Sequence, residues 1–370
     1  MTSTAIANAI PTPAERLPIL NVGRTFVHPM FDLFVIGGLL TLPIALWAAF
    51  ANQSASAFIG ATFPVIALVC NQAHFAASTV RLYTKPRTYQ DLPFLTMGFP
   101  LVTIAVATAF VAFADRVGNH LYLLYLTWSP YHYAAQTFGL ATMYCYRSGC
   151  RLDRKEWWAI RIACVVPFLQ AFIAGAPVGS GLGWLVPYAT LVSEPRVFGV
   201  VSASFTVLNT ASFALPIALF GWIAYRSRYA PAMRAADGSR RPGMPLMSLV
   251  LMLSNASWWV LFAYWDALIW ATVLHGLQYL GILSIFYSDD ALRREGNQHG
   301  RSYHVSVLLL VCVALGYGLF QCWPRAYMLA GFGQVESTLM VLAAVNIHHF
   351  VVDGYIWRIR KDHNYATVVA

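Results

Sequence analysis

The sequence predicts an all-α fold, a polytopic membrane helix bundle of about ten transmembrane helices with cytoplasmic N- and C-termini. Three observations lead to this class. Of the 370 residues, 58% are hydrophobic and only 11% are charged, whereas about 25% of the residues of an average soluble domain are charged. Apolar runs of about 20 residues, the length that crosses a bilayer, recur along the whole chain. Positive residues gather in alternate connections between these runs, as their preference for the cytoplasmic side requires.

Ten apolar runs with short connections divide the chain. The seventh and eighth are joined in a stretch too long for one span, so we expect the chain to turn near Tyr264–Asp266. A single transmembrane helical domain over 27–358 is expected between a cytoplasmic tail at 1–26 and another at 359–370. The longest outer connection is 177–197. The predicted spans are 30–50, 56–80, 93–114, 119–146, 157–176, 198–225, 247–264, 265–287, 304–322 and 335–357.

The net charge of +9 does not indicate nucleic-acid binding, because the cations lie in short clusters between apolar runs and form no single patch. We assign them to membrane orientation and exclude nucleic acid as a partner. The pattern favours a multi-pass protein of a bacterial-type inner (plasma) membrane, with membrane lipids as its partners and no protein partner predicted. The six cysteines form no CxxC pair, so we expect buried apolar side chains instead of disulfides or a zinc site.

Histidines interrupt four of the apolar runs, and all four runs are predicted to cross from the outer to the inner side. Ionisable residues at membrane depth are costly and indicate function. In the adjacent pair of the last run, neighbouring residues lie about 100° apart on a helix, so one imidazole should face the site and the other a neighbouring helix. The candidate metal ligands are His74, His132, His275, His348 and His349.

Each of these runs also has a polar residue three or four positions from a histidine. Residues at this spacing share a helix face, and metal-bound imidazoles usually donate their second N–H to such a partner. The pattern therefore predicts one shared metal or cofactor site with a supporting polar shell, although each histidine could instead be a packing residue with an interhelical hydrogen bond. The candidate cofactor-binding partners are Asn71, Gln136, Gln278, Asn346 and Asp353, of which Asp353 favours His349 as the inward member of the pair.

Imidazoles with some carboxylate suit iron, zinc or copper. The HExxH motif and the repeated histidine boxes of membrane desaturases are both absent. Our leading hypothesis is a metal-dependent oxidoreductase resembling non-haem iron oxygenases, with iron, O2 and a lipophilic small-molecule substrate. Tyr133 and Tyr279 are the candidate catalytic residues, as donors of a proton or a hydrogen bond. The sequence does not distinguish a carotenoid, an acyl chain, a quinone or a small amphiphile as substrate.

Three alternatives remain open at this stage. Haem b could be held by His132 and His275, or another transition metal could take the place of iron. A proton-coupled transporter could use the histidines as a relay, with helices broken at VIGGLLTLP (35–43) and NTASFALP (209–216) around a midplane site. A non-enzymatic pigment-binding membrane protein is the third alternative.

Overall fold

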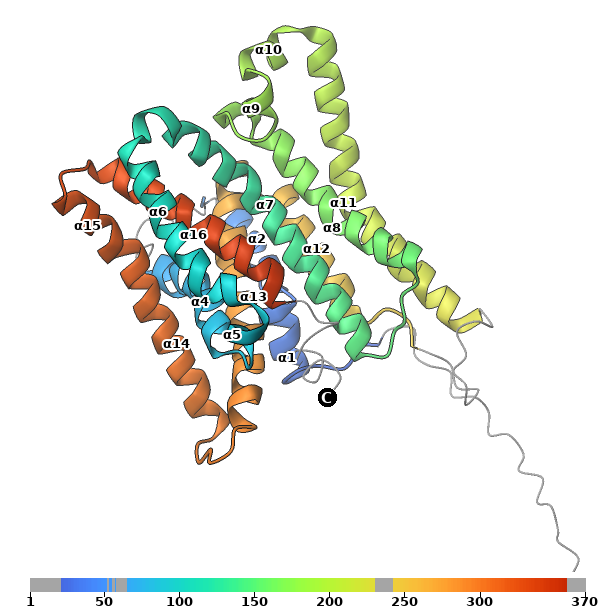
Figure 1. Ribbon diagram of the computed structural model, residues 1–370. Coiled ribbons are helices and arrows are strands. Elements are labelled where there is room, and N and C mark those ends of the chain that lie inside the picture. The colour runs from blue at the N-terminus through green and yellow to red at the C-terminus, as the bar shows by residue number, and fades with distance from the viewer. Residues whose placement is uncertain (1–20, 52, 55–56, 58–64, 230–241, 358–370) are drawn as a thin grey trace, which may run out of the picture.

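The described residues form an all-helical bundle without strands, which confirms the predicted all-α class (Figure 1). The predicted tail at 359–370 lies outside the described residues, as does most of the tail at 1–26. Of the second predicted run, the structure describes residue 57 and the part from residue 65 onwards. The computed structural model describes residues 21–51, 53–54, 57, 65–229 and 242–357.

Two packed groups of long helices make up the bundle, and α7 contacts both. The first group contains α7 (Ala114–Arg147), α8 (Arg154–Ala174), α11 (Pro195–Tyr229) and α12 (Leu246–Leu261). The second contains α4 (Ala73–Thr84), α6 (Phe99–Ala112), α13 (Tyr264–Leu292), α14 (Arg301–Tyr317) and α16 (Gln334–Ile356). Shorter elements complete the described chain: α1 (Pro29–Phe31), η1 (Asp32–Ile36), α2 (Thr41–Phe50), η2 (Ala67–Gln72), α5 (Thr88–Asp91), η3 (Phe94–Gly98), η4 (Ala176–Val178), α9 (Leu182–Leu185), α10 (Tyr188–Ser193), η6 (Gly318–Cys322) and α15 (Trp323–Leu329).

Six helical segments of the described chain are long and apolar enough to cross a membrane, and a bent pair would make a seventh. This supports a membrane-embedded helix bundle. The other predicted runs are also helical where they are described, but α4 and α12 are short and α7 is more polar, so the count of ten stays a prediction. The six segments are Phe94–Ala112, Arg154–Ala174, Pro195–Tyr229, Tyr264–Leu292, Arg301–Leu329 and Gln334–Ile356.

The transporter alternative would place helix breaks in two segments, and the structure has only the first. At 35–43 the chain bends by 56° between η1 and α2. Gly38 has a φ of +75°, and a Cβ there would approach Gln278 Nε2 to 2.8 Å, so this break packs directly against α13. The second expected break, at 209–216, lies within the continuous helix α11. The pair of corresponding breaks that favoured a transporter is therefore not present.

The predicted turn near Tyr264–Asp266 lies slightly earlier, at 262–263, between α12 and α13. Asp266 belongs to the first turn of α13. A carboxylate in this position is stabilised by the positive end of the helix dipole, so the residue begins a helix instead of forming the turn. The connection 177–197 contains the short helices α9 and α10 (Figure 1).

Two glycines let neighbouring helices touch the backbone of η2, the π-helical turn that precedes His74. A Cβ on Gly276 of α13 would lie 2.0 Å from the carbonyl oxygen of Cys70, and one on Gly316 of α14 would lie 2.7 Å from that of Gln72. No side chain fits at such distances, so both positions require glycine. π-Helical turns within helices often accompany functional sites. The close packing holds the start of α4, and with it His74, against α13.

Candidate metal centre

Four imidazoles meet inside the bundle, each from a different helix: His74 of α4, His132 of α7, His275 of α13 and His349 of α16. Their exposed fractions are 1%, 8%, 0% and 0%. The ring centroid of His74 lies 5.0 Å from those of His275 and His349. The ring centroid of His132 lies 5.0 Å from that of His275 and 4.9 Å from that of His349. We call these four residues the histidine cluster.

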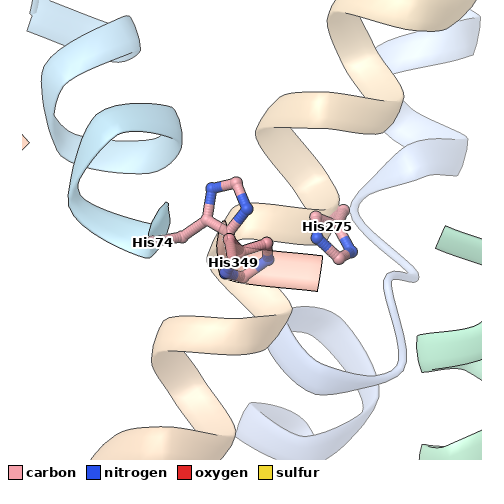
Figure 2. A group of neighbouring side chains, drawn as sticks. All are labelled: His74, His275 and His349. Carbon is pink, nitrogen blue, oxygen red and sulfur yellow. The ribbon is translucent and has the colours of Figure 1, made fainter. Parts of the chain in front are cut away.

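The nitrogens of the cluster are close enough to one another to consider shared coordination. One nitrogen each of His74, His275 and His349 lie within 4.8 Å of one another, and Figure 2 shows the three side chains approaching from their separate helices. A second such group consists of His132, His349 and the carboxylate of Asp353. His349 belongs to both groups, so it is the central residue of the cluster.

Several cluster nitrogens have no hydrogen-bond partner among the described residues. These are both ring nitrogens of His74, both of His275, and Nδ1 of His349. Buried polar atoms in proteins are nearly always paired, so such a concentration in one place requires an explanation. A bound cation is one, because neutral imidazole nitrogens are good metal ligands. Because such bonds are about 2.0–2.1 Å long for zinc, the nitrogens would have to move closer together to coordinate one ion.

A hydrogen-bonded chain fixes the carboxylate of Asp353 at the edge of the cluster. Its Oδ2 lies 3.4 Å from Nε2 of His349 and 3.8 Å from Nε2 of His132. Its Oδ1 accepts a hydrogen bond of 2.7 Å from the hydroxyl of Tyr279, and Trp357 Nε1 donates to that hydroxyl at 3.3 Å. The two Nε2 atoms of His132 and His349 are 3.1 Å apart. Asp353 therefore places a carboxylate within ion-pair distance of both imidazoles, without a hydrogen bond to either ring in the described chain.

The predicted amide partners lie beside the cluster, but none of the four hydrogen-bonds to an imidazole within the described chain. Gln136 Nε2 donates to the carbonyl oxygen of His275 at 3.3 Å and to Oε1 of Gln278 at 3.4 Å. Asn346 Nδ2 donates to the carbonyl of its own helix at Leu342, and the side-chain oxygen of Asn71 has no partner. Backbone carbonyls take side-chain donors of Gln136 and Asn346, so helical spacing alone does not pair these amides with an imidazole.

His348 lies outside the cluster, contrary to its inclusion among the candidate metal ligands. Its Nδ1 is 2.8 Å from the hydroxyl of Thr103 on α6, and its ring stacks on Phe99. The rotation of about 100° between adjacent helix residues turns it away from the direction that His349 takes.

Tyr133 is next to the cluster, because its ring centroid is 4.5 Å from that of His275, but its hydroxyl is paired with Thr272 at 2.7 Å.

Sequence reasoning missed two residues that shape this centre. Trp357, at the end of the last predicted run, donates its indole N–H to the hydroxyl of Tyr279. Gly276 follows His275 directly, and a Cβ at this position would come within 3.2 Å of His74 Nδ1. No sequence pattern marks Trp357 or Gly276, apart from a nearby aspartate and an adjacent histidine, because both contacts join segments that are far apart in the chain.

A cavity of about 350 Å³ opens beside the cluster, between α7, α13 and α16. We call it the α7–α16 cavity. His132 and Asp353 form part of its wall, and aromatic and aliphatic side chains such as Trp128, Tyr131 and Phe350 form most of the rest. The residues that line it include no lysine or arginine. Its size and lining are typical of a site for a small apolar ligand.

Comparisons with known proteins do not assign this arrangement. No protein-family model matches the chain, and neither does any curated protein or solved structure. The function is therefore inferred from the geometry of the described residues alone.

Proposed function

We propose that this chain is a multi-pass membrane oxidoreductase that binds a transition-metal ion, iron in preference to others, in the histidine cluster and oxidises a lipophilic substrate with O2. The observation that carries the proposal is the convergence of four buried imidazoles from four helices, with the carboxylate of Asp353 at their edge. Imidazole ligands with a carboxylate and open positions are typical of non-haem iron oxygenases. Iron, when bound, would supply O2 binding and one-electron chemistry.

The residues of the cluster have separable roles in this proposal. His74, His275 and His349 would hold the ion, since one nitrogen of each lies within 4.8 Å of the others, and both nitrogens of His74 and His275 and Nδ1 of His349 have no hydrogen-bond partner among the described residues. His132 faces both the cluster and the α7–α16 cavity, so it is the imidazole closest to an incoming substrate. Asp353 would hold a proton near the substrate and His132, and Tyr279 would keep the carboxylate in position by its hydrogen bond to Oδ1.

The α7–α16 cavity favours oxidation over hydrolysis. A hydrolytic metal acts on a polarised carbonyl or phosphoryl group, and such groups usually come with polar or charged surroundings. The wall of this cavity is mainly apolar and carries no cation to neutralise an acyl or phosphate headgroup. A neutral hydrocarbon-like substrate suits it best, and the chemistry that modifies such a molecule is oxidation of C–H or C=C bonds.

The geometry favours a bare ion over haem. The rings of His132 and His275, the predicted axial pair, are in direct edge-to-face contact with their centroids 5.0 Å apart. The space between the two rings is therefore too narrow for a porphyrin. Both rings also contact other members of the cluster, so moving them apart would disturb all four imidazoles.

Oxygen incorporation tests this proposal directly. Iron-loaded protein in liposomes, supplied with a membrane lipid extract, a chemical reductant and ¹⁸O₂, should form a lipid-soluble product that carries ¹⁸O. Gly139→Leu should lower its formation at least about tenfold, because misplacing a substrate by an ångström costs about 100-fold in rate. Gly139 lines the α7–α16 cavity, and a Cβ there contacts no atom within 4 Å, so the leucine would fill the cavity without moving the backbone.

Gly221→Leu is the matched control, because a Cβ on this residue of α11 also contacts nothing within 4 Å and the position does not line the α7–α16 cavity. This variant should form as much product as the unmodified chain. Absence of labelled product from iron-loaded protein, or full activity of the Gly139 variant, would contradict the proposed reaction or its substrate site.

The membrane topology has its own test. With ten spans, reporters fused at the N-terminus, after Gly149 and at the C-terminus should all lie on the cytoplasmic side. If only the six long apolar helices cross, Gly149 alone should lie on the opposite side, since a single span, Phe94–Ala112, precedes it. If the bent pair at Pro29–Phe50 also crosses, the C-terminus alone should be opposite. Paired cytoplasmic and periplasmic reporters at these three positions distinguish the three topologies.

A further inference from the structure

A second cavity, of about 390 Å³, lies between α4, α6, α15 and α16. We call it the α4–α6 cavity. Phe75, Tyr83, Pro100 and Trp323 contribute to a wall that is almost entirely apolar, and no charged side chain lines it. His348 is the only histidine among the residues that line it, and Thr103 is one of two threonines. The proposed oxidation does not use this cavity.

The hydrogen bonds of Thr103 favour one of the two tautomers of His348. The hydroxyl of Thr103 donates to the carbonyl oxygen of Phe99 at 2.9 Å. The tautomer of His348 that satisfies both contacts of this hydroxyl is the one in which Nδ1, 2.8 Å away, donates to the hydroxyl oxygen. Neutral imidazole has one N–H, which in this tautomer lies on Nδ1. Nε2 is left as an acceptor, and no described residue donates a hydrogen bond to it.

We propose that the α4–α6 cavity binds a neutral lipophilic molecule with a phenolic hydroxyl group, such as a phenol or quinol, and that this hydroxyl donates to Nε2 of His348. The absence of charged lining residues disfavours carboxylates and phosphates. The hydroxyl of Tyr83, which also lines this cavity, already donates to the carbonyl oxygen of Thr96 at 2.7 Å. An aromatic ligand ring matches the side chains of Phe75 and Trp323 in the wall.

This cavity lies only one aromatic ring away from the histidine cluster. Phe75 lines it, and the same ring lies 4.1 Å from the ring centroid of His74 and 5.0 Å from that of His349. A bound phenol or quinol would therefore be next to the cluster but would not contact it. The proposed binding does not depend on metal content or on the proposed oxidation, so either can fail without the other.

The test compares two probes that differ in a single hydrogen-bond donor. Protein in lipid nanodiscs is dialysed against 4-hexylphenol or its methyl ether, 4-hexylanisole, with protein-free nanodiscs as the baseline for lipid partitioning. The phenol should bind about three- to tenfold more tightly than the ether, as expected for one buried hydrogen bond. His348→Phe should bind both probes equally, because it retains an aromatic ring and loses the acceptor.

Two further variants locate the site. Thr79→Phe places a large side chain in the wall of the α4–α6 cavity and should weaken both probes, whereas Gly139→Leu fills the α7–α16 cavity and should leave the phenol preference unchanged. Equal binding of phenol and ether by the unmodified protein would overturn the proposal. So would a phenol preference that survives in a folded His348→Phe protein, with folding judged by unchanged size-exclusion behaviour.

Discussion

Protein with His349→Ala should retain at most about a tenth of the metal that the unmodified chain binds. His349 contributes a nitrogen to both candidate ligand groups and contacts the rings of His74 and His132. Loss of even a supporting residue around a metal typically lowers affinity 10- to 100-fold, and loss of a central ligand should cost at least as much. Mass-spectrometric metal analysis of anaerobically purified protein, with iron supplied during growth, measures the effect.

His348→Ala is the matched control, because it removes the neighbouring imidazole from the same turn of α16. It should keep its metal, since His348 bonds to Thr103 on α6 and not to the cluster. Equal metal loss in both variants, or full metal content in the His349 variant, would contradict the assignment of the cluster as the metal centre. An optical spectrum of the same samples separates iron from haem, because haem alone produces a Soret band.

Asp290→Asn should destabilise the protein by about 3–5 kcal/mol, the usual cost of removing one partner of a buried ion pair. Asp290 Oδ2 accepts a hydrogen bond of 2.6 Å from Arg81, and these side chains are only 8% and 1% exposed. The change removes the negative charge that Asp290 places beside the buried guanidinium. The pair joins α4, which carries His74, to α13, which carries His275. Reversible denaturant unfolding in detergent measures the loss.

Asp289→Asn serves as the control for this change, because Asp289 is adjacent on α13 but pairs with Arg301, whose side chain is 50% exposed. Exposed pairs contribute about 0–1 kcal/mol, so the control should be close to the unmodified protein. The double variant Arg81→Met with Asp290→Leu should recover much of the lost stability, since it removes both charges together. A single Asp290 variant as stable as its control would show that the ion pair is not a buried stabilising contact.

The sequence by itself predicted the all-helical membrane class and identified most of the residues that form the candidate centre. Both depend on local patterns: long apolar runs, few charges, and histidines where apolar residues are expected. Asp353 was also identified this way, because residues four apart share a helix face, and it does lie beside His349. The relation between His348 and His349 followed from helix geometry in the same manner.

Only the tertiary structure decided that the four imidazoles meet at one point. Distances along the chain between His74, His132, His275 and His349 say nothing about how deeply or in which direction each helix presents its histidine. That depends on close packing, for example at Gly276 against η2. Helix packing also directed the amides to backbone carbonyls and Trp357 to Tyr279, and it created two separate cavities beside α16. Such contacts join residues far apart in the chain, where no periodic pattern can encode them.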